Sequence, residues 1–111
     1  MRVVALTAHG LCDLQKAEAL VLDWFESEGL ELVHAQGGVL IGWSEASLTP
    51  HSPVPSLAVE VRLYDLGGGW LQARWNLQLT PGEALQSRTG ELLDSLRRRL
   101  RAEPLWRMDG P

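Results

Sequence analysis

Three side chains that could do chemistry stand close together near the start of the chain: His9, Cys12 and Asp13. They follow a short apolar run and precede a helical pattern, so they fall at a strand-to-helix turn. A thiolate there would be stabilised by the helix N-terminus, and a nearby histidine could act as its base. Free cysteines, however, are among the most buried residue types, and aspartate is a common helix cap. We therefore expect a structural Cys12 and no catalytic thiol.

Two further patterns suggest ligand chemistry but do not complete it. The histidines His9, His34 and His51 could join Cys12 around zinc, yet none sits at a familiar ligand spacing and no second cysteine exists. The glycines of residues 67–69 join two predicted strands and open no helix, so the phosphate-binding mechanism is missing. We expect no catalytic residues, no cofactor site and no metal site.

The basic residues gather near the C-terminus, with a tryptophan close behind them: Arg97, Arg98, Arg99, Arg101 and Trp106. Cations at the end of a helix are favoured by the helix dipole, so a solvated helix end is the simplest interpretation. Contact with an acidic protein surface is a second interpretation. Nucleic-acid binding, which uses cations together with stacking aromatic rings, is a third.

Five tryptophans in 111 residues is an unusual number. Trp24, Trp43 and Trp75 fall on apolar faces of predicted elements, and we expect them in the core. Trp70 lies at the end of a predicted hairpin and Trp106 lies in the tail, and exposed tryptophans are enriched at protein interfaces. For Trp106, docking of the tail on the chain's own body is an equal alternative. The candidate partner-binding residues are therefore Trp70, Arg97, Arg98, Arg101 and Trp106. Polar residues placed to line a pocket are Cys12 and His34.

The elements that position these residues can be predicted from periodicity. Residues 2–8 form an apolar run typical of a buried strand. Asp13 is expected to cap a helix that Gly29 terminates. Residues 31–35 and 39–44 flank a glycine turn and predict a hairpin in which His34 is partly buried. The prolines between residues 45 and 56 predict an extended surface loop, which could gate a pocket.

The clearest pattern is a second hairpin, in which residues 57–64 and 71–79 alternate strictly between apolar and polar. Period two on both arms means that one face is buried and the other is wet. With a loop over 65–69, we predict a register in which Glu60 lies opposite Arg74. The alternative places Arg62 opposite Arg74, and like charges directly opposite are destabilising.

Pro81 then opens a second helix that ends near Ala102. The predicted class is α+β: a mostly antiparallel sheet in the order β-α-β-β-β-β-α with two helices packed on one face. Residues 1–103 form a single domain and residues 104–111 a C-terminal tail. By element order alone this is similar to the helix-grip and TATA-binding-protein-like folds. The similarity concerns architecture and implies no function.

The amino-acid composition disfavours several classes of function and cellular location. A single cysteine permits no intramolecular disulfide and fits a reducing compartment. No window approaches the ~20 apolar residues of a membrane helix, and the N-terminus lacks a signal-peptide pattern. We expect a cytoplasmic protein without membrane contact. The net charge of −4 disfavours nucleic acid. The dominance of arginine over lysine indicates a GC-rich genome or a thermophile.

Two functional hypotheses remain. The first is a non-catalytic protein-interaction module, such as an adaptor, small chaperone or regulatory subunit, that forms a homodimer. Its basis is the pair of exposed tryptophans, the acidic first helix against the basic last helix, and the missing catalytic groups. The alternative is a small-molecule-binding domain or enzyme of helix-grip type, with a pocket between the sheet and the helices.

Overall fold

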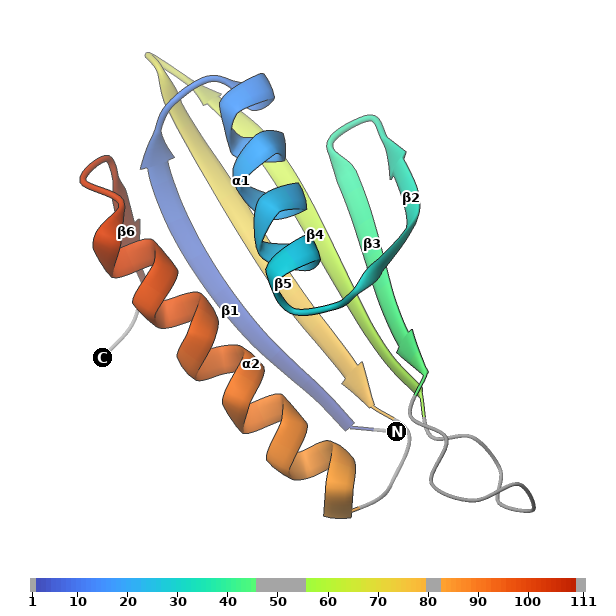
Figure 1. The fold of residues 1–111 in the computed structure, drawn as a ribbon. Helices are drawn as coiled ribbons and strands as arrows, with labels where there is room; N and C mark the ends of the chain where they lie inside the picture. The colour runs from blue at the N-terminus through green and yellow to red at the C-terminus, as the bar shows by residue number, and fades with distance from the viewer. Residues whose placement is uncertain (1, 46–55, 80–82, 110–111) are drawn as a thin grey trace.

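The computed structural model describes residues 2–45, 56–79 and 83–109 (Figure 1). The proline-containing loop and the predicted start of the second helix at Pro81 lie outside these residues. The elements, in chain order, are β1 (Arg2–Leu11), α1 (Leu14–Ser27), β2 (Glu31–Gln36), β3 (Val39–Glu45), β4 (Ser56–Gly67), β5 (Trp70–Leu79), α2 (Glu83–Ala102) and β6 (Trp106–Met108).

The six strands form one antiparallel sheet in the order β2-β3-β4-β5-β1-β6. β2 to β5 follow one another as a meander, whereas β1 and β6 join the far side of β5. Both helices cover the same face, as Figure 1 shows. The predicted α+β class, with its antiparallel sheet and two helices on one face, is confirmed.

The core lies between that face and the helices. Alternate residues of the central strands point into it, in agreement with their period-two pattern. The largest fully buried side chains include Trp24 and Phe25 of α1, Trp75 of β5, and Leu92 and Leu96 of α2. The core positions predicted for Trp24 and Trp75 are confirmed.

Local chemistry sets the ends of α1 as expected. Asp13 caps the helix, because its Oδ1 accepts a hydrogen bond from the Lys16 amide at 2.8 Å. Gly29 follows the helix with a φ of 71°, a conformation that glycine adopts without steric cost. The second helix ends at Ala102, as predicted.

The register predicted for the β4–β5 hairpin is wrong, because Arg62 lies directly opposite Arg74. A bulge at Leu66 shortens the loop to Gly68 and Gly69 and shifts the pairing. Each arginine has its own partner instead. Arg62 Nε lies 2.6 Å from the Glu60 carboxylate, and the Arg74 guanidinium lies 5.3 Å from the centre of the Tyr64 ring.

Two predictions on the first hairpin are also wrong. Trp43 points to the face opposite the helices, since Leu40 and Gly42 occupy the buried positions of β3. A Cβ at Gly42 would lie only 2.9 Å from Phe25 Cε2, so glycine is what lets α1 approach the sheet. His34 is exposed rather than partly buried, because the side chains of β2 are exposed along its whole length.

The segment expected to be a tail contains a strand that the sequence pattern did not reveal. β6 pairs with β1 through Ala8, His9 and Gly10. It extends the sheet at the edge that β1 would otherwise form alone.

Candidate functional site

An apolar patch lies at the end of the sheet where β4 turns into β5. It consists of Leu11, Trp70 and Leu105, which we call the turn-end patch. Leu11 lies opposite Trp70 in the β1–β5 register, and its amide donates to the Leu105 carbonyl at 2.8 Å. The three side chains are 42%, 46% and 52% exposed. The next outward-facing positions of β5, Gln72 and Arg74, are polar, so polar side chains border the patch along this strand.

The patch borders a depression of about 190 Å³. Pro104, Trp106 and Arg107 complete its lining, together with the three patch residues. The structure therefore brings together Trp70 and Trp106, two of the candidate partner-binding residues. Arg107 adds an exposed cation at the margin.

Trp106 is anchored to its own chain. Its ring packs over Gly10, where a Cβ would lie 2.6 to 2.8 Å from three ring atoms. It also meets the buried Trp75 edge-on, with ring centroids 6.3 Å apart. Such a contact contributes about 0.5–1.5 kcal/mol beyond the buried area. Trp106 thus fastens β6 to the core.

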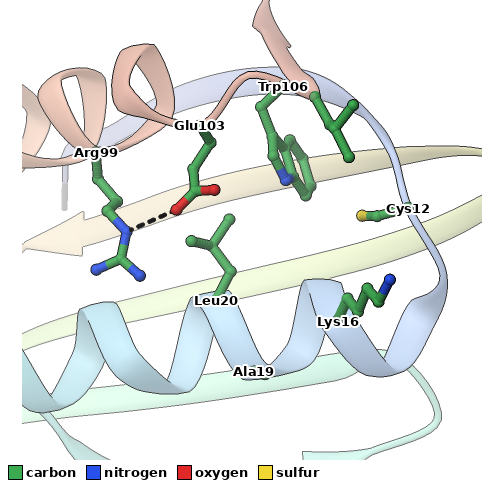
Figure 2. A pocket seen from close by; sticks show the side chains of 8 residues that line it. Cys12, Lys16, Ala19, Leu20, Arg99, Glu103 and Trp106 are labelled. Carbon is green, nitrogen blue, oxygen red and sulfur yellow. Dashed lines mark hydrogen bonds and ion pairs between the residues drawn. The ribbon is translucent and has the colours of Figure 1, made fainter.

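A cleft of about 300 Å³ lies between the two helices, and Figure 2 shows its lining. Leu20 rises from α1 and faces the Trp106 ring across the cleft. Arg99 of α2 and Glu103, which follows this helix, line one end, and Cys12 with Lys16 lines the other. The cleft therefore combines an apolar middle with charged ends.

Ion pairs hold the charged end of α2 against α1. Arg99 lies 2.5 Å from the Asp23 carboxylate of α1 and 3.4 Å from the carboxylate of Glu103, just beyond the end of α2. The hydrogen bond to Asp23 raises the pKa of Arg99 above its usual range. Arg99 therefore closes one end of the cleft as a permanent cation whose charge is largely balanced.

A second polar bridge joins the helices at the end of α1. The Trp24 indole donates to Ser95 Oγ at 3.3 Å, and Ser95 in turn donates to the Glu28 carboxylate. Arg88 reaches the Glu28 carbonyl at 2.6 Å. These contacts satisfy the last backbone turn of α1 and set the spacing of the helices.

The histidine–cysteine pair considered from the sequence does not form. Both ring nitrogens of His9 are engaged: Nδ1 lies 2.7 Å from the Asp109 carboxylate and Nε2 lies 3.3 Å from Gln72. Burial raises the pKa of the Cys12 thiol, the neighbouring Asp13 adds to that rise, and Lys16 opposes it. The thiol therefore lacks both a free base and a stabilised thiolate.

The remaining candidate residues are dispersed. His34 lies on β2, at the sheet edge opposite the cleft that Cys12 lines, so these two do not share a pocket. Arg97 and Arg101 lie together on a groove beside β1, and Arg98 is exposed without lining it. His51 lies outside the described residues.

Within the part of the chain that the structure describes, no three His, Cys, Asp or Glu side chains gather as a metal site. In the same part, neither helix is long and apolar enough to cross a membrane.

Several residues of these sites could not be identified from the sequence. Leu11 and Leu105 meet only because β6 pairs with β1, and Leu20 reaches the cleft only because Trp106 folds over Gly10. No periodic signal was available, because residues 104–106 are Pro, Leu and Trp in a row and β6 has three residues.

No protein-family model matches the sequence, and no curated protein matches it. Among solved structures, an HSP90 activator from Plasmodium falciparum is similar over 98% of this chain and 100% of its own, with 8% identity and a TM-score of 0.58. CalU16 from Micromonospora echinospora aligns with 88% of this chain and 75% of its own, at 13% identity and a TM-score of 0.47. A START superfamily protein from Mycobacterium smegmatis aligns with 88% and 93%, at 11% identity and a TM-score of 0.46.

At these identities a likeness concerns the fold alone, and the two with TM-scores below 0.5 are too weak to support an argument. The chain therefore shares with the Plasmodium protein an α+β architecture.

Proposed function

We propose that this chain is a non-catalytic protein-interaction module that contacts another protein through the turn-end patch. The observation that carries the proposal is the grouping of Leu11 of β1, Trp70 of β5 and Leu105 of the turn before β6, each side chain about half exposed. Tryptophan and arginine are the residues that most often dominate binding energy, and Trp70 and Arg107 both line the depression there. The simplest partner is a second copy of the chain.

Burial on a partner would supply the affinity. Removing apolar surface from water contributes about 25 cal/mol per Å² before the costs of association. The Plasmodium protein of the same fold is described as an activator of HSP90, so a fold of this kind can act by contacting another protein. The identity of 8% gives no reason to assign the same partner here.

The test compares two double variants. Trp70→Ser with Leu105→Ser removes the centre of the patch. Leu32→Ser with Val33→Ser removes two side chains of similar exposure, 43% and 54%, from β2 at the other edge of the sheet. In sedimentation at ~100 μM, a dimer with a Kd near 1 μM would be fully visible. We expect the parent and the β2 variant to be dimers and the patch variant to be a monomer.

A monomeric parent would contradict self-association and leave a different partner as the remaining form of the proposal. Affinity capture from the native host then decides: the parent and the β2 variant should retain a protein that the patch variant loses. Equal capture by all three would overturn the proposal.

A second candidate function is small-molecule binding in the interhelix cleft. It is favoured by the cleft's volume of about 300 Å³ and by its apolar middle with charged ends. Leu20→Trp should fill the cleft, since Leu20 lines it and is only partly buried against the core. If the cleft has a ligand, native mass spectrometry of protein from its host should show a bound small molecule on the parent and none on Leu20→Trp. Bare protein in both cases would dismiss this candidate.

A further inference from the structure

The edge strand β1 is covered along only part of its length. β1 spans ten residues, and β6 pairs with Ala8, His9 and Gly10. One further hydrogen bond joins the Asp109 amide to the Thr7 carbonyl at 2.9 Å. Among the residues that the structure describes, no strand lies beside the first five residues of β1 on this side. This stretch is an open sheet edge.

The direction of the backbone groups along this edge follows from the pairing with β6. The Thr7 carbonyl and the Leu11 amide both point toward β6, since they bond to it. In an antiparallel strand, alternate residues direct their backbone groups to the same side. Val3 and Ala5 therefore present their N–H and C=O groups at the open edge, whereas Val4 and Leu6 bond to β5.

A groove of about 610 Å³ accompanies this edge. Its residues come from three elements: Ala5, Leu6 and Thr7 of β1, Arg97 and Arg101 of α2, and Met108 and Asp109 of β6. Figure 1 shows α2 running beside β1 in the same direction, so the helix forms one wall of the groove. Arg97 and Arg101 are one helical turn apart and both exposed.

The charges on this wall favour an acidic occupant. Arg97 has one carboxylate nearby, Asp94 at 3.6 Å, in an exposed pair within the helix. Asp109, the carboxylate at the β6 end of the groove, is held by His9. The groove therefore offers two cations beside a row of backbone groups that pair with no strand in the described part of the chain.

We propose that the open edge of β1 binds an extended acidic segment of another protein as an added strand. The segment would continue the line of β6 and run antiparallel to β1. Side chains at every second position would face α2, so that carboxylates at these positions meet Arg97 and Arg101. Five residues of strand, about 17 Å at 3.4 Å each, would cover the edge from Val3 to Thr7. This surface is separate from the turn-end patch and does not depend on self-association.

A second copy of the chain fits this edge less well. Antiparallel pairing of two β1 edges about a two-fold axis would place both α2 helices on the same face of the joined sheet. Arg97 and Arg101 of each copy would then face those of the other, and like charges across an interface are unfavourable.

The test uses amide hydrogen exchange with a synthetic peptide of alternating valine and glutamate, about seven residues long. In the free protein, the Val3 and Ala5 amides should exchange rapidly and those of Val4 and Leu6 slowly. Saturating peptide should protect Val3 and Ala5. The same peptide with N-methyl groups on every second amide should not bind, since it cannot complete the ladder.

Charge variants test the second half of the proposal. Arg97→Ser with Arg101→Ser should weaken peptide binding about tenfold, the effect of two surface ion pairs. Arg98→Ser is the matched control, because Arg98 belongs to the same cluster but does not line the groove. It should bind within twofold of the parent.

Four results would overturn the proposal. The first is equal affinity for the methylated and unmethylated peptides. The second is equal loss of binding in the Arg98 variant and the groove variant. The third is protection of Val3 and Ala5 that rises with protein concentration in the absence of peptide, which would mean that a second copy occupies the edge. Displacement of the peptide by a single-stranded oligonucleotide at equal concentration would identify the groove as a nucleic-acid site instead.

Discussion

Gly10 shows how one missing side chain holds an element in place. Any larger residue there would collide with the Trp106 ring, which is the main apolar anchor of β6. This requirement could not be predicted from the sequence, because glycine at a strand end is usually a sign of a turn. The close approach becomes evident only once residues 10 and 106 are known to be paired.

We predict that Gly10→Ala destabilises the fold by about 1–3 kcal/mol, the usual cost of overpacking. The control is Gly90→Ala in α2, where an added Cβ meets nothing within 4 Å. That change should stabilise the protein by about 0.5–1 kcal/mol, because alanine is the better helix former. Urea denaturation of both variants measures the difference, and equal stability would show that Trp106 does not rest on Gly10.

A second prediction at the scale of single residues concerns Trp75. It is 1% exposed and contacts Trp106, yet its indole N–H has no hydrogen-bond partner among the described residues. Trp75→Ala should cost about 3–5 kcal/mol through the cavity it leaves. Trp75→Phe should cost less, since it keeps most of the ring and removes an unsatisfied donor. A melting temperature for Trp75→Ala within a degree or two of the parent would contradict the assigned core.

Cys12 should react slowly with thiol reagents at neutral pH. Its pKa is raised, chiefly by burial, so the thiolate fraction at pH 7 is smaller than in a free peptide. The sign for stability follows: the folded state holds the proton more tightly, so this contribution is present at neutral pH and is lost as the pH rises above the thiol's ordinary range. Modification rates measured from pH 6 to 10 should rise only in the alkaline part. Faster labelling than a free cysteine peptide at pH 7 would mean an activated thiol.

At the scale of elements, the sequence predicted what depends on local periodicity and missed what depends on pairing. The helices, the β4–β5 hairpin and the Asp13 cap follow from spacing and propensity, and they agree with the structure. The hairpin register was predicted from a cross-strand charge match, but a bulge and a two-glycine turn decided it. Strand twist favours such short glycine turns, and each arginine then found a neighbour on its own strand or diagonally across.

β6 was missed for a related reason. It has three residues, too few for a periodic signal, and it is stabilised by β1 at the other end of the chain. The same reasoning explains the candidate sites. Trp70 and Trp106 could be identified by type, but their shared depression depends on the pairing of β6 with β1.

Removal of residues 104–111 should therefore destabilise the fold rather than merely trim it. The deletion uncovers the Trp75 ring edge and leaves β1 without β6. We expect a drop in melting temperature of about 4–8 °C for each kcal/mol lost in a domain of this size. The amides of His9 and Leu11, which face β6, should become exchangeable, while those of Ala8 and Gly10 stay protected by β5. Unchanged exchange at His9 and Leu11 would show that β6 is not docked in solution.

At the scale of the whole molecule, charge is divided between the two ends of the chain. Residues 1–80 carry nine acids and four bases, and residues 81–111 carry five acids and six bases. Some of these opposite charges form ion pairs within the protein. Arg88 of α2 pairs with Glu28 at the end of α1, and Arg99 of α2 pairs with Asp23 of α1. Arg97, Arg98 and Arg101 remain on the surface. The composition predicted this charge imbalance, but it did not predict which arginines form ion pairs within the protein.

The position of β1 in the sheet also affects how the protein folds while the ribosome synthesises it. The meander from β2 to β5 can pair as it emerges, because each strand bonds to the next. β1 is synthesised before the other strands, but its partner β5 comes much later. Arg2 can pair only after Leu79 has been synthesised, and Leu11 only after Trp70 has been synthesised. At translation rates of roughly 5–20 residues per second, that wait lasts roughly 3–15 s. During this interval an apolar strand with two unsatisfied edges is available to chaperones and to neighbouring nascent chains, so the nascent chain is most vulnerable to misassembly before its fifth strand is complete.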